Sequence, residues 1–269
     1  MPYICPICES SLKLDNRTWR CSQNHCFDIA KEGYVNLLPV QKKKSKDPGD
    51  NQLMMQARRE FLNQGHYQFL SDRVNVLLEE HLKNHATMLD LGCGEGYYTG
   101  RLAEALQVKS LQIYGLDISK VAVRYGAKRY KDITFCVASA FDTPFAPQSL
   151  DAVLRIYAPS KLEELKRIIK PGGVLLTVSA GPIHHWFLKT VIYKEPKPHP
   201  EETDNLDGFE LIFSERLQQK INLKQKDDIE NFLNMTPYAW KLDDSQKQQL
   251  CQQGLECELD FKLQLHRRQ

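Results

Sequence analysis

The pattern of apolar and polar residues changes near residue 85. Between residues 52 and 84 apolar side chains recur at helical spacing with few breakers, which predicts two or three helices. From Thr87 onward, short apolar runs alternate with helical segments, and the predicted strands are TMLDLG, LQIYGLD, ITFCVAS, SLDAVLRIYA and GGVLLTVSAG. This alternation predicts an α/β fold: a doubly wound, Rossmann-like parallel sheet with helices on both faces. Near the C-terminus, LECELDFKLQLH alternates polar and apolar residues and predicts an antiparallel edge strand.

The first 26 residues contain four of the eight cysteines. The opening MPYICPICES lacks the basic and apolar regions of a signal peptide, and no apolar run approaches the ~20 residues of a membrane span. We therefore expect a cytoplasmic protein that does not cross a membrane. In that compartment, clustered cysteines favour metal binding or buried thiols over disulfides.

The cysteines have the spacing of a zinc site. Cys5 and Cys8 form one pair, and Cys21 opens CSQNHC, in which His25 or Cys26 would supply the fourth ligand. Two ligands on each of two loops suit tetrahedral Zn²⁺, and the three residues between Cys21 and His25 give the second loop room to turn, which favours His25. A site with four protein ligands is closed, so we expect a structural zinc. The alternative is four buried thiols without metal.

The chain of 269 residues has a net charge of only +2, so its overall charge does not require a nucleic-acid partner. Two stretches are locally basic. Residues 97–131 carry Arg101, Lys109, Lys120, Arg124, Lys128, Arg129 and Lys131 against two acids, and QKKKSKDPGD carries Lys42, Lys43, Lys44 and Lys46. Each is either a solvated surface or a track for the phosphates of a nucleic acid.

The most informative motif is LDLGCGEGYYTG, which follows a predicted strand and opens a predicted helix. Gly92, Gly94 and Gly96 allow a tight turn and close approach of a ligand to the backbone. Asp90 lies two residues before the first glycine, where a carboxylate suits a cationic amino group. Asp117 ends the next predicted strand, where its carboxylate can accept both hydroxyls of a ribose.

With IKPGG before the fifth strand, these features resemble the class I S-adenosylmethionine-dependent methyltransferases over residues 85–180. A nicotinamide-dependent dehydrogenase has a similar fold, but it favours the spacing Gly-x-Gly-x-x-Gly and a pyrophosphate at the helix N-terminus. It would not explain Asp90.

Almost the whole chain is similar to one family within that class, the RlmA-type 23S rRNA (guanine-N1-)-methyltransferases. The segments that carry the resemblance are the zinc motif, FDIAKEGYVNLLPVQ, DPGD, MMQARREFL, GHY, LDLGCGEGYYT, RIYAP and MTPYAW. The resemblance implies S-adenosylmethionine as cofactor and 1-methylguanosine as product, in a hairpin loop of 23S ribosomal RNA. It also implies a zinc module that helps to bind the RNA, and a homodimer.

The family pattern also implies site residues. Tyr67 of GHY, Gly94 and Glu95 of the glycine loop, and His184 of GPIHH match cofactor positions of the family. Taken without the resemblance, Tyr67 suits a core aromatic and His184 a polar loop residue. His185 is the weaker match, because the pattern aligns with the first histidine.

The expected reaction needs no catalytic metal, because the sulfonium already activates the methyl group and the protein mainly supplies alignment. Guanine N1 must lose a proton, and we assign no catalytic base from the sequence. Arg155 and Tyr157 of RIYAP are candidates for handling the target base. Aromatic residues suited to stack on an unpaired base are Tyr97, Tyr98, Tyr157, Tyr238 and Trp240.

We therefore expect a zinc-binding, RNA-recognition module in residues 1–36, a basic linker and helical segment in 37–84, and a methyltransferase domain in 85–269. Two other functions compete with this interpretation. A methyltransferase of another RNA or of a small molecule would share the cofactor fold, although a small-molecule enzyme has little use for a zinc module followed by lysines. A non-catalytic binding module would not need Asp90, the glycine loop and Asp117.

Overall fold

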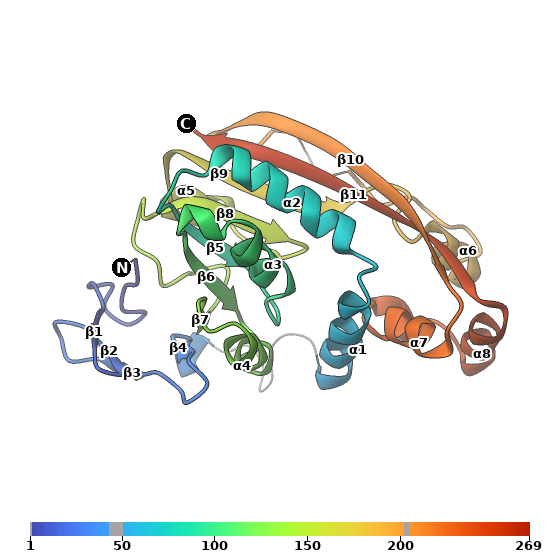
Figure 1. The fold of residues 1–269 in the computed structure, drawn as a ribbon, viewed down its shortest axis with the longest axis horizontal. Helices are drawn as coiled ribbons and strands as arrows, with labels where there is room; N and C mark the ends of the chain where they lie inside the picture. The colour runs from blue at the N-terminus through green and yellow to red at the C-terminus, as the bar shows by residue number, and fades with distance from the viewer. Residues whose placement is uncertain (1, 43–50, 202–204) are drawn as a thin grey trace.

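The computed structural model describes residues 2–42, 51–201 and 205–269. Its centre is a mixed sheet of eight strands among these residues, in the order β10-β11-β9-β8-β5-β6-β7-β4 (Figure 1). The strands are β4 (Val35–Asn36), β5 (Thr87–Leu91), β6 (Gln112–Asp117), β7 (Thr134–Val137), β8 (Leu150–Ile156), β9 (Ile169–Ala180), β10 (Phe209–Leu223) and β11 (Leu255–Arg268).

The five strands predicted between Thr87 and residue 181 are β5 to β9, and their mutual pairings are parallel. The predicted doubly wound parallel sheet is thereby confirmed. The prediction of an edge strand near the C-terminus is wrong in its position. β11 is antiparallel to β9, as expected, but β10 pairs along its whole length on the other side and forms the edge. The burial pattern agrees, because β11 is buried at ten of its fourteen positions, as an interior strand should be.

The two faces of the sheet are covered by different elements. Alternation along the strands divides the core: Met88 and Leu154 face one cluster, whereas Leu89 and Val153 face the other. Helices α2 (Gln68–His81), α3 (Tyr97–Ala105) and α4 (Lys120–Arg129) contribute to the first cluster. The second cluster includes α5 (Leu162–Ile168) and apolar residues of the N-terminal module.

The N-terminal module is a small antiparallel sheet of β1 (Lys13–Asp15), β2 (Thr18–Arg20) and β3 (Cys26–Asp28). It is joined to the main sheet by packing as well as by the chain. The ring of Tyr3 is buried and lies 5.2 Å from the ring of Trp19 and 5.3 Å from that of Tyr114 in β6. Strand β4 then pairs with β7 at the edge of the main sheet. These contacts fix the module against the second face.

Helix α1 (Gln52–Asn63) begins at Asn51, whose side chain caps the helix by accepting a hydrogen bond from the Met54 N–H. It packs against α7 (Lys226–Asn234), which in turn contacts α8 (Asp244–Gln253), whereas α6 (Trp186–Ile192) packs against β11. Short 3₁₀ helices are η1 (Val40–Lys42), η2 (Gln107–Lys109) and η3 (Pro237–Trp240).

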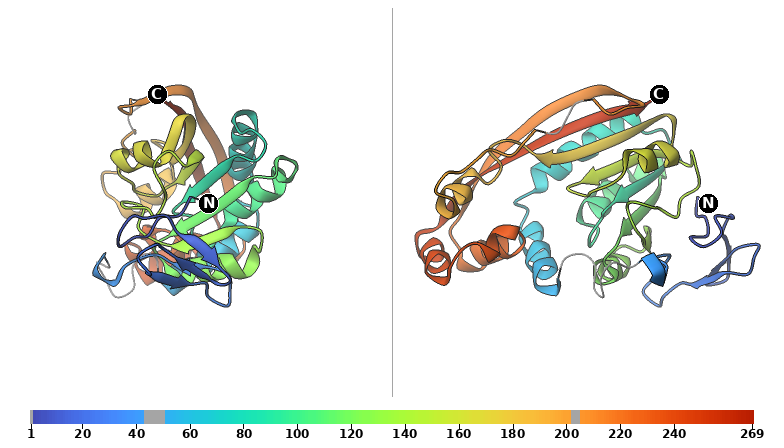
Figure 2. Two further views of the ribbon diagram at one scale, coloured as in Figure 1. Left: turned by 90° about the vertical axis from the view of Figure 1, so that its left-hand side faces the viewer. Right: turned by 180° about the vertical axis from the view of Figure 1, so that it is seen from behind.

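Figures 1 and 2 show β10 and β11 as a long curved ribbon that runs from the sheet to α7 and α8, at the end of the molecule opposite the N-terminal module. In the described residues no helix is long and apolar enough to cross a membrane.

Candidate active site and metal centre

A cavity of about 770 Å³ opens at the carboxyl ends of the central parallel strands. This is the edge at which open α/β sheets bind their ligands. One wall is the glycine loop with the ends of β6 and β8. The rest of the lining comes from α1, from the start of α2, from the loop after β9 and from residues 235–238. The predicted residues Tyr67, Asp90, Gly92, Gly94, Glu95, Asp117 and His184 all line this cavity.

The glycine loop has the left-handed backbone that its sequence predicts. Gly92, Gly94 and Gly96 have φ values of 82°, 55° and 79°. A Cβ on Gly92 would lie 2.4 Å from the Cβ of Ala158, so a side chain there would collide with the loop after β8. A Cβ on Gly94 would meet no atom within 4 Å. Gly92 therefore permits close packing, whereas Gly94 keeps the backbone accessible from the cavity.

Asp90 is a buried acid at the end of β5. One carboxylate oxygen accepts a hydrogen bond of 2.5 Å from the Thr99 hydroxyl of α3. Burial raises the pKa of Asp90 to about 7, with a further contribution from the negative charge of Asp117. A cation that enters the cavity beside this group would favour its charged form. The carboxyl is therefore suited to receive a positively charged ligand group.

Asp117 connects β6 to the glycine loop. Its Oδ2 accepts the N–H of Gly94 at 2.9 Å, and its Oδ1 accepts the N–H of Ser119 at 2.8 Å. These two bonds orient the carboxylate at the cavity wall.

Glu95 follows Gly94 in the glycine loop, next to the bond between Gly94 and Asp117. Its Oε1 is buried, has no hydrogen-bond partner among the described residues, and lies 3.6 Å from the Arg59 guanidinium of α1. Burial raises the pKa of Glu95 in spite of that neighbouring cation. A buried acceptor without a donor suits a ligand that brings the missing hydrogen bond.

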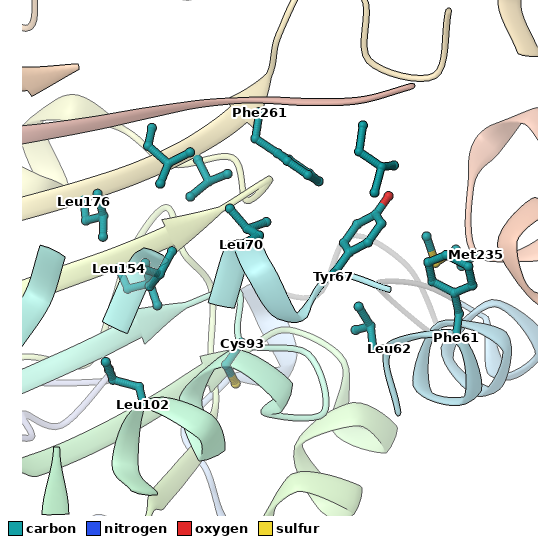
Figure 3. Packing of buried hydrophobic residues seen from close by; sticks show 14 of the residues in the cluster. Phe61, Leu62, Tyr67, Leu70, Cys93, Leu102, Leu154, Leu176, Met235 and Phe261 are labelled. Carbon is teal, nitrogen blue, oxygen red and sulfur yellow. The ribbon is translucent and has the colours of Figure 1, made fainter. Parts of the chain in front are cut away.

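Tyr67 lies where the prediction placed it, at the start of α2 and against the cavity. Figure 3 shows its ring beneath Phe261 of β11 and near Leu62 of α1. The ring makes edge-to-face contacts with Phe61 and Phe261, with centroids 5.5 Å and 5.2 Å away. Its hydroxyl lies 3.1 Å from Nε2 of His185. Tyr67 is thus both a core aromatic and a cavity residue.

His184 and His185 both line the cavity, with their rings stacked 3.8 Å apart. His184 Nδ1 accepts the backbone N–H of Asp260 at 3.0 Å, and its Nε2 lies 3.3 Å from the Tyr157 hydroxyl. Burial lowers the pKa of His184 to about 3 and that of His185 well below its usual value. Both rings are therefore neutral at physiological pH.

RIYAP forms the end of β8 and the loop after it. Tyr157 lines the cavity and has a φ of 53°. This backbone conformation is unfavourable for a bulky residue, and such strained residues are often found at functional sites. Arg155 is not part of the cavity wall, and its guanidinium donates to the Ser160 hydroxyl at 3.1 Å. Of the other predicted aromatics, Tyr97, Tyr98 and Tyr238 line the cavity, whereas Trp240 lies outside it and is 69% exposed.

The metal centre has the predicted ligands. The ligand atoms of Cys5, Cys8, Cys21 and His25 lie within 4.8 Å of one another. The Cys8 and Cys21 sulfurs are 3.7 Å apart, and Nδ1 of His25 lies 3.4 Å from the Cys21 sulfur. A tetrahedral zinc with Zn–S bonds of ~2.3 Å requires sulfur separations of about 3.8 Å. Three thiolates and one imidazole at this spacing therefore fit a closed, structural Zn²⁺ site.

Cys26 is outside the cluster. Its side chain is exposed, and its sulfur contacts the Asn24 carbonyl instead, at 3.2 Å. Cys5 and Cys21, by contrast, are buried in the module. The cluster thus contains His25 and not Cys26, in agreement with the spacing argument.

The basic stretches have partly structural roles. In α4, Arg124 forms an ion pair with Glu32 at 2.9 Å, and Lys131 donates to the Glu32 and Ala127 carbonyls. Lys42 forms an ion pair with Asp142. Lys43, Lys44 and Lys46 lie outside the described residues. Lys120, Lys128 and Arg129 are exposed on α4.

Several cavity residues were not predicted. Examples are Arg58 and Arg59 of α1, His199 after α6, and Met235 and Thr236 after α7. MMQARREFL contains the two arginines, but its helical periodicity alone did not indicate which face meets the cofactor site. His199 lies in the proline-rich EPKPHPE, which carries no periodic signal.

Comparison with known proteins agrees with this architecture. A family model for the N-terminal zinc ribbon of RlmA matches residues 3–46, and a methyltransferase-domain model matches residues 82–233. The chain is 31% identical to the 23S rRNA (guanine(748)-N1)-methyltransferase of Streptomyces fradiae, over 89% of this chain and 86% of that one. It is 29% identical to a candidate 23S rRNA (guanine-N1-)-methyltransferase of Bacillus subtilis, over 88% and 86%.

Among solved structures, a candidate methyltransferase of Bacillus halodurans aligns with a TM-score of 0.50 at 17% identity, over 73% of this chain and 98% of that one, which shows the shared fold. Together, the zinc ribbon, the methyltransferase domain and the full-length similarity lead to one assignment. The chain belongs to the RlmA family of 23S rRNA (guanine-N1-)-methyltransferases, which has the class I S-adenosylmethionine-dependent fold.

Proposed function

We propose that this protein transfers the methyl group of S-adenosylmethionine to N1 of a guanine in a hairpin loop of 23S ribosomal RNA. The observation that carries the proposal is the cavity in which Asp90, Gly94 and Asp117 converge, on a chain whose zinc module packs on the same sheet. The family to which the chain belongs supports the choice of RNA and of guanine N1.

The cofactor would lie along the glycine loop. Asp90 would receive the methionine ammonium, and its raised pKa fits a carboxyl that ionises fully when that cation arrives. Asp117 would accept the ribose hydroxyls at the end of β6, where bonds from the Gly94 and Ser119 N–H groups orient its carboxylate. The Gly92–Gly94 backbone would approach the cofactor closely. Glu95, Tyr67 and His184 would complete its surroundings, because all three line the same cavity.

The cofactor supplies a methyl group on a positively charged sulfur. The protein's part is to hold that group in line with guanine N1 and to exclude water. Tyr97, Tyr98, Tyr157 and Tyr238 give the cavity aromatic walls on which an unpaired base can stack. N1 lies on the pairing edge of guanine, so a base in a loop reaches the cavity at lower cost than a paired one.

We propose the division of labour expected from the sequence: a zinc-binding, RNA-recognition module in residues 1–36, a basic linker and helical segment in 37–84, and a methyltransferase domain in 85–269. The contacts of Tyr3 with Tyr114 and Phe145 support a module that is held rigidly beside the catalytic sheet. Such a module can grip one part of the RNA while the target base enters the cavity.

We also propose that the protein is a homodimer in the cytoplasm. A ribosomal RNA substrate favours that compartment. The long edge strand β10 has one side without a strand partner in the described residues, which leaves backbone groups available for a contact between copies. Light scattering at several protein concentrations tests the oligomeric state.

The experiment that tests the function is incubation with methyl-labelled S-adenosylmethionine and, in parallel, 23S rRNA, total transfer RNA and a pool of small metabolites. We expect label in 23S rRNA alone. Label in the metabolite pool would favour a small-molecule methyltransferase, and label in transfer RNA would favour another RNA substrate. Labelling of neither RNA nor metabolites would contradict the proposed activity.

A further inference from the structure

We propose that His199 is the proton acceptor that removes the N1 proton of the target guanine. This inference rests on the proposed function and deepens it, because methylation at N1 requires a base and nothing above has assigned one. As the N1–CH₃ bond forms, the S–CH₃ bond breaks and its electron pair stays on sulfur. The N1 proton passes to Nδ1 of His199, which later releases it to water.

The carboxylates that line the cavity lie in the glycine loop and near the ends of β5 and β6, where we place the cofactor. Among the described lining residues, the acids are Asp90, Glu95 and Asp117. Asp90 is bonded to Thr99, Asp117 is bonded to the backbone of the glycine loop, and Glu95 lies beside Arg59. The other lining residues that could accept a proton are histidines and tyrosines. The ordinary pKa of tyrosine is about 10, and burial raises the pKa of Tyr67 and Tyr98 further, so the tyrosines of the cavity are protonated at neutral pH.

Hydrogen bonds rule out His184 as that acceptor. Its Nδ1 accepts the N–H of Asp260, so in the neutral ring the proton is on Nε2. That proton points to the Tyr157 hydroxyl, at 3.3 Å. His184 thus has no lone pair directed into the cavity. Its role is to orient Tyr157.

His185 is a weaker acceptor than its position in the cavity wall suggests. Its ring is buried between the ring of His184, at 3.8 Å, and the edge of Phe232, at 4.9 Å. Its Nε2 is already paired with the Tyr67 hydroxyl. Gaining a proton there would place a charge in an apolar environment, which burial opposes.

The hydrogen bond made by His199 leaves one of its ring nitrogens able to accept a proton. Its Nε2 lies 3.1 Å from the backbone carbonyl of His184, and since a carbonyl can only accept, Nε2 must carry the proton. In the neutral ring, Nδ1 then carries the lone pair. The residue lines the cavity and is only partly buried, so proton transfer onward to water is open. Its backbone N–H donates to the Pro182 carbonyl at 3.0 Å, which fixes the segment against the loop after β9.

The surroundings of His199 keep it unprotonated before reaction. Burial lowers its pKa, and the ammonium of Lys189 in α6 lowers it further. The His184 carbonyl and the carboxylate of Asp260 in β11 act in the opposite direction. The net direction is downward from the ordinary histidine value of about 6.5. A neutral imidazole is therefore available at physiological pH.

The test uses single-turnover methylation of a 23S rRNA fragment at saturating S-adenosylmethionine and RNA, between pH 5 and 9. In wild type we expect the rate to fall as pH drops through the pKa of His199, because the protonated ring cannot accept a proton. His199→Gln keeps a donor to the His184 carbonyl but has no basic nitrogen. We expect it to lower the rate at pH 7.5 by at least about 100-fold, the lower range of general-base effects, and to remove that inflection.

His81→Gln is the matched control, because the His81 ring also bonds a backbone carbonyl, that of Leu77, and does not line the cavity. It should retain the wild-type rate. Calorimetry with S-adenosylmethionine and a filter-binding assay with RNA should give unchanged affinities for His199→Gln. If that variant does not fold, His199→Asn provides the same test.

Two results would overturn the inference: a His199→Gln rate within threefold of wild type, or a wild-type inflection that persists in the variant. A failure of the proposed function is distinct, because wild type itself would then form no 1-methylguanosine.

Discussion

The backbone N–H of Gly94 donates to Oδ2 of Asp117 over 2.9 Å, which joins the glycine loop after β5 to the acid at the end of β6. The bond fixes two parts of the proposed cofactor site relative to each other, although 23 residues separate them. A change at either end should therefore alter the shape of the loop as well as the local contact.

Asp117→Ala should weaken binding of S-adenosylmethionine. It removes the proposed charge-assisted hydrogen bonds to the ribose, each of about 1.5–3 kcal/mol, and the acceptor that holds the Gly94 N–H. We expect calorimetry to show an affinity at least tenfold lower. Asp132→Ala, at an exposed acid outside the cavity, should bind as wild type does. Equal affinities for the two variants would contradict the role of Asp117.

Asp90 should make cofactor binding depend on pH. Its pKa in the free protein is raised to about 7, whereas the ammonium of the bound cofactor favours the ionised form. Affinity for S-adenosylmethionine should therefore fall as pH decreases below about 7, and Asp90→Asn should remove that dependence. Calorimetry between pH 5.5 and 8.5 tests this, and a wild-type affinity that is constant over the range would exclude it.

The same substitution should stabilise the free protein. A carboxyl whose pKa is raised on folding binds more protons in the folded state, so its contribution to stability is lost as pH rises through about 7. Asparagine removes this cost and keeps an oxygen that can accept from Thr99. Thermal unfolding at pH 8 should give a higher midpoint for Asp90→Asn than for wild type, and a lower midpoint would show that Asp90 is stabilised in the free protein.

Gly92→Ala should mainly reduce the stability of the fold, whereas Gly94→Ala should mainly reduce cofactor affinity. At Gly92 the new methyl would lie 2.4 Å from the Cβ of Ala158, so we expect strong destabilisation. At Gly94 the methyl meets no atom, and the left-handed backbone costs about 1–2 kcal/mol. Gly94→Ala should therefore fold and yet bind the cofactor poorly. Denaturant unfolding and calorimetry measure the two effects, and tight binding by Gly94→Ala would place the cofactor elsewhere.

The zinc ligands make a prediction that distinguishes neighbouring residues. Cys21→Ser should release the metal and impair RNA methylation more than cofactor binding, because structural zinc sites contribute about 10–16 kcal/mol of apparent binding free energy. Cys26→Ser should retain one zinc per chain, since its sulfur lies outside the cluster. Metal analysis after dialysis decides the point. Loss of zinc from Cys26→Ser with retention in His25→Ala would reverse the ligand assignment.

The sequence predicted those features that depend on local pattern. Strand–helix alternation identified β5 to β9, and fixed spacing identified the glycine loop, Asp117 and the four zinc ligands. β10 was missed because FSERLQQKIN reads as a polar stretch. It forms a strand because β11 pairs with it over its full length. This contact is non-local, so strand propensity alone cannot predict it. The same is true of His199, which reaches the cavity only through its bonds to Pro182 and His184.

The central claim is methylation of guanine at N1 in 23S rRNA, and the most direct measurement is reverse transcription of 23S rRNA treated with the enzyme and S-adenosylmethionine. N1 lies on the Watson–Crick edge, so a methyl group there blocks pairing. The account predicts a new stop at one hairpin-loop guanine, together with 1-methylguanosine in the digested RNA, and less of both after treatment with Asp117→Ala at a limiting cofactor concentration. Identical stop patterns with and without wild-type enzyme would contradict it.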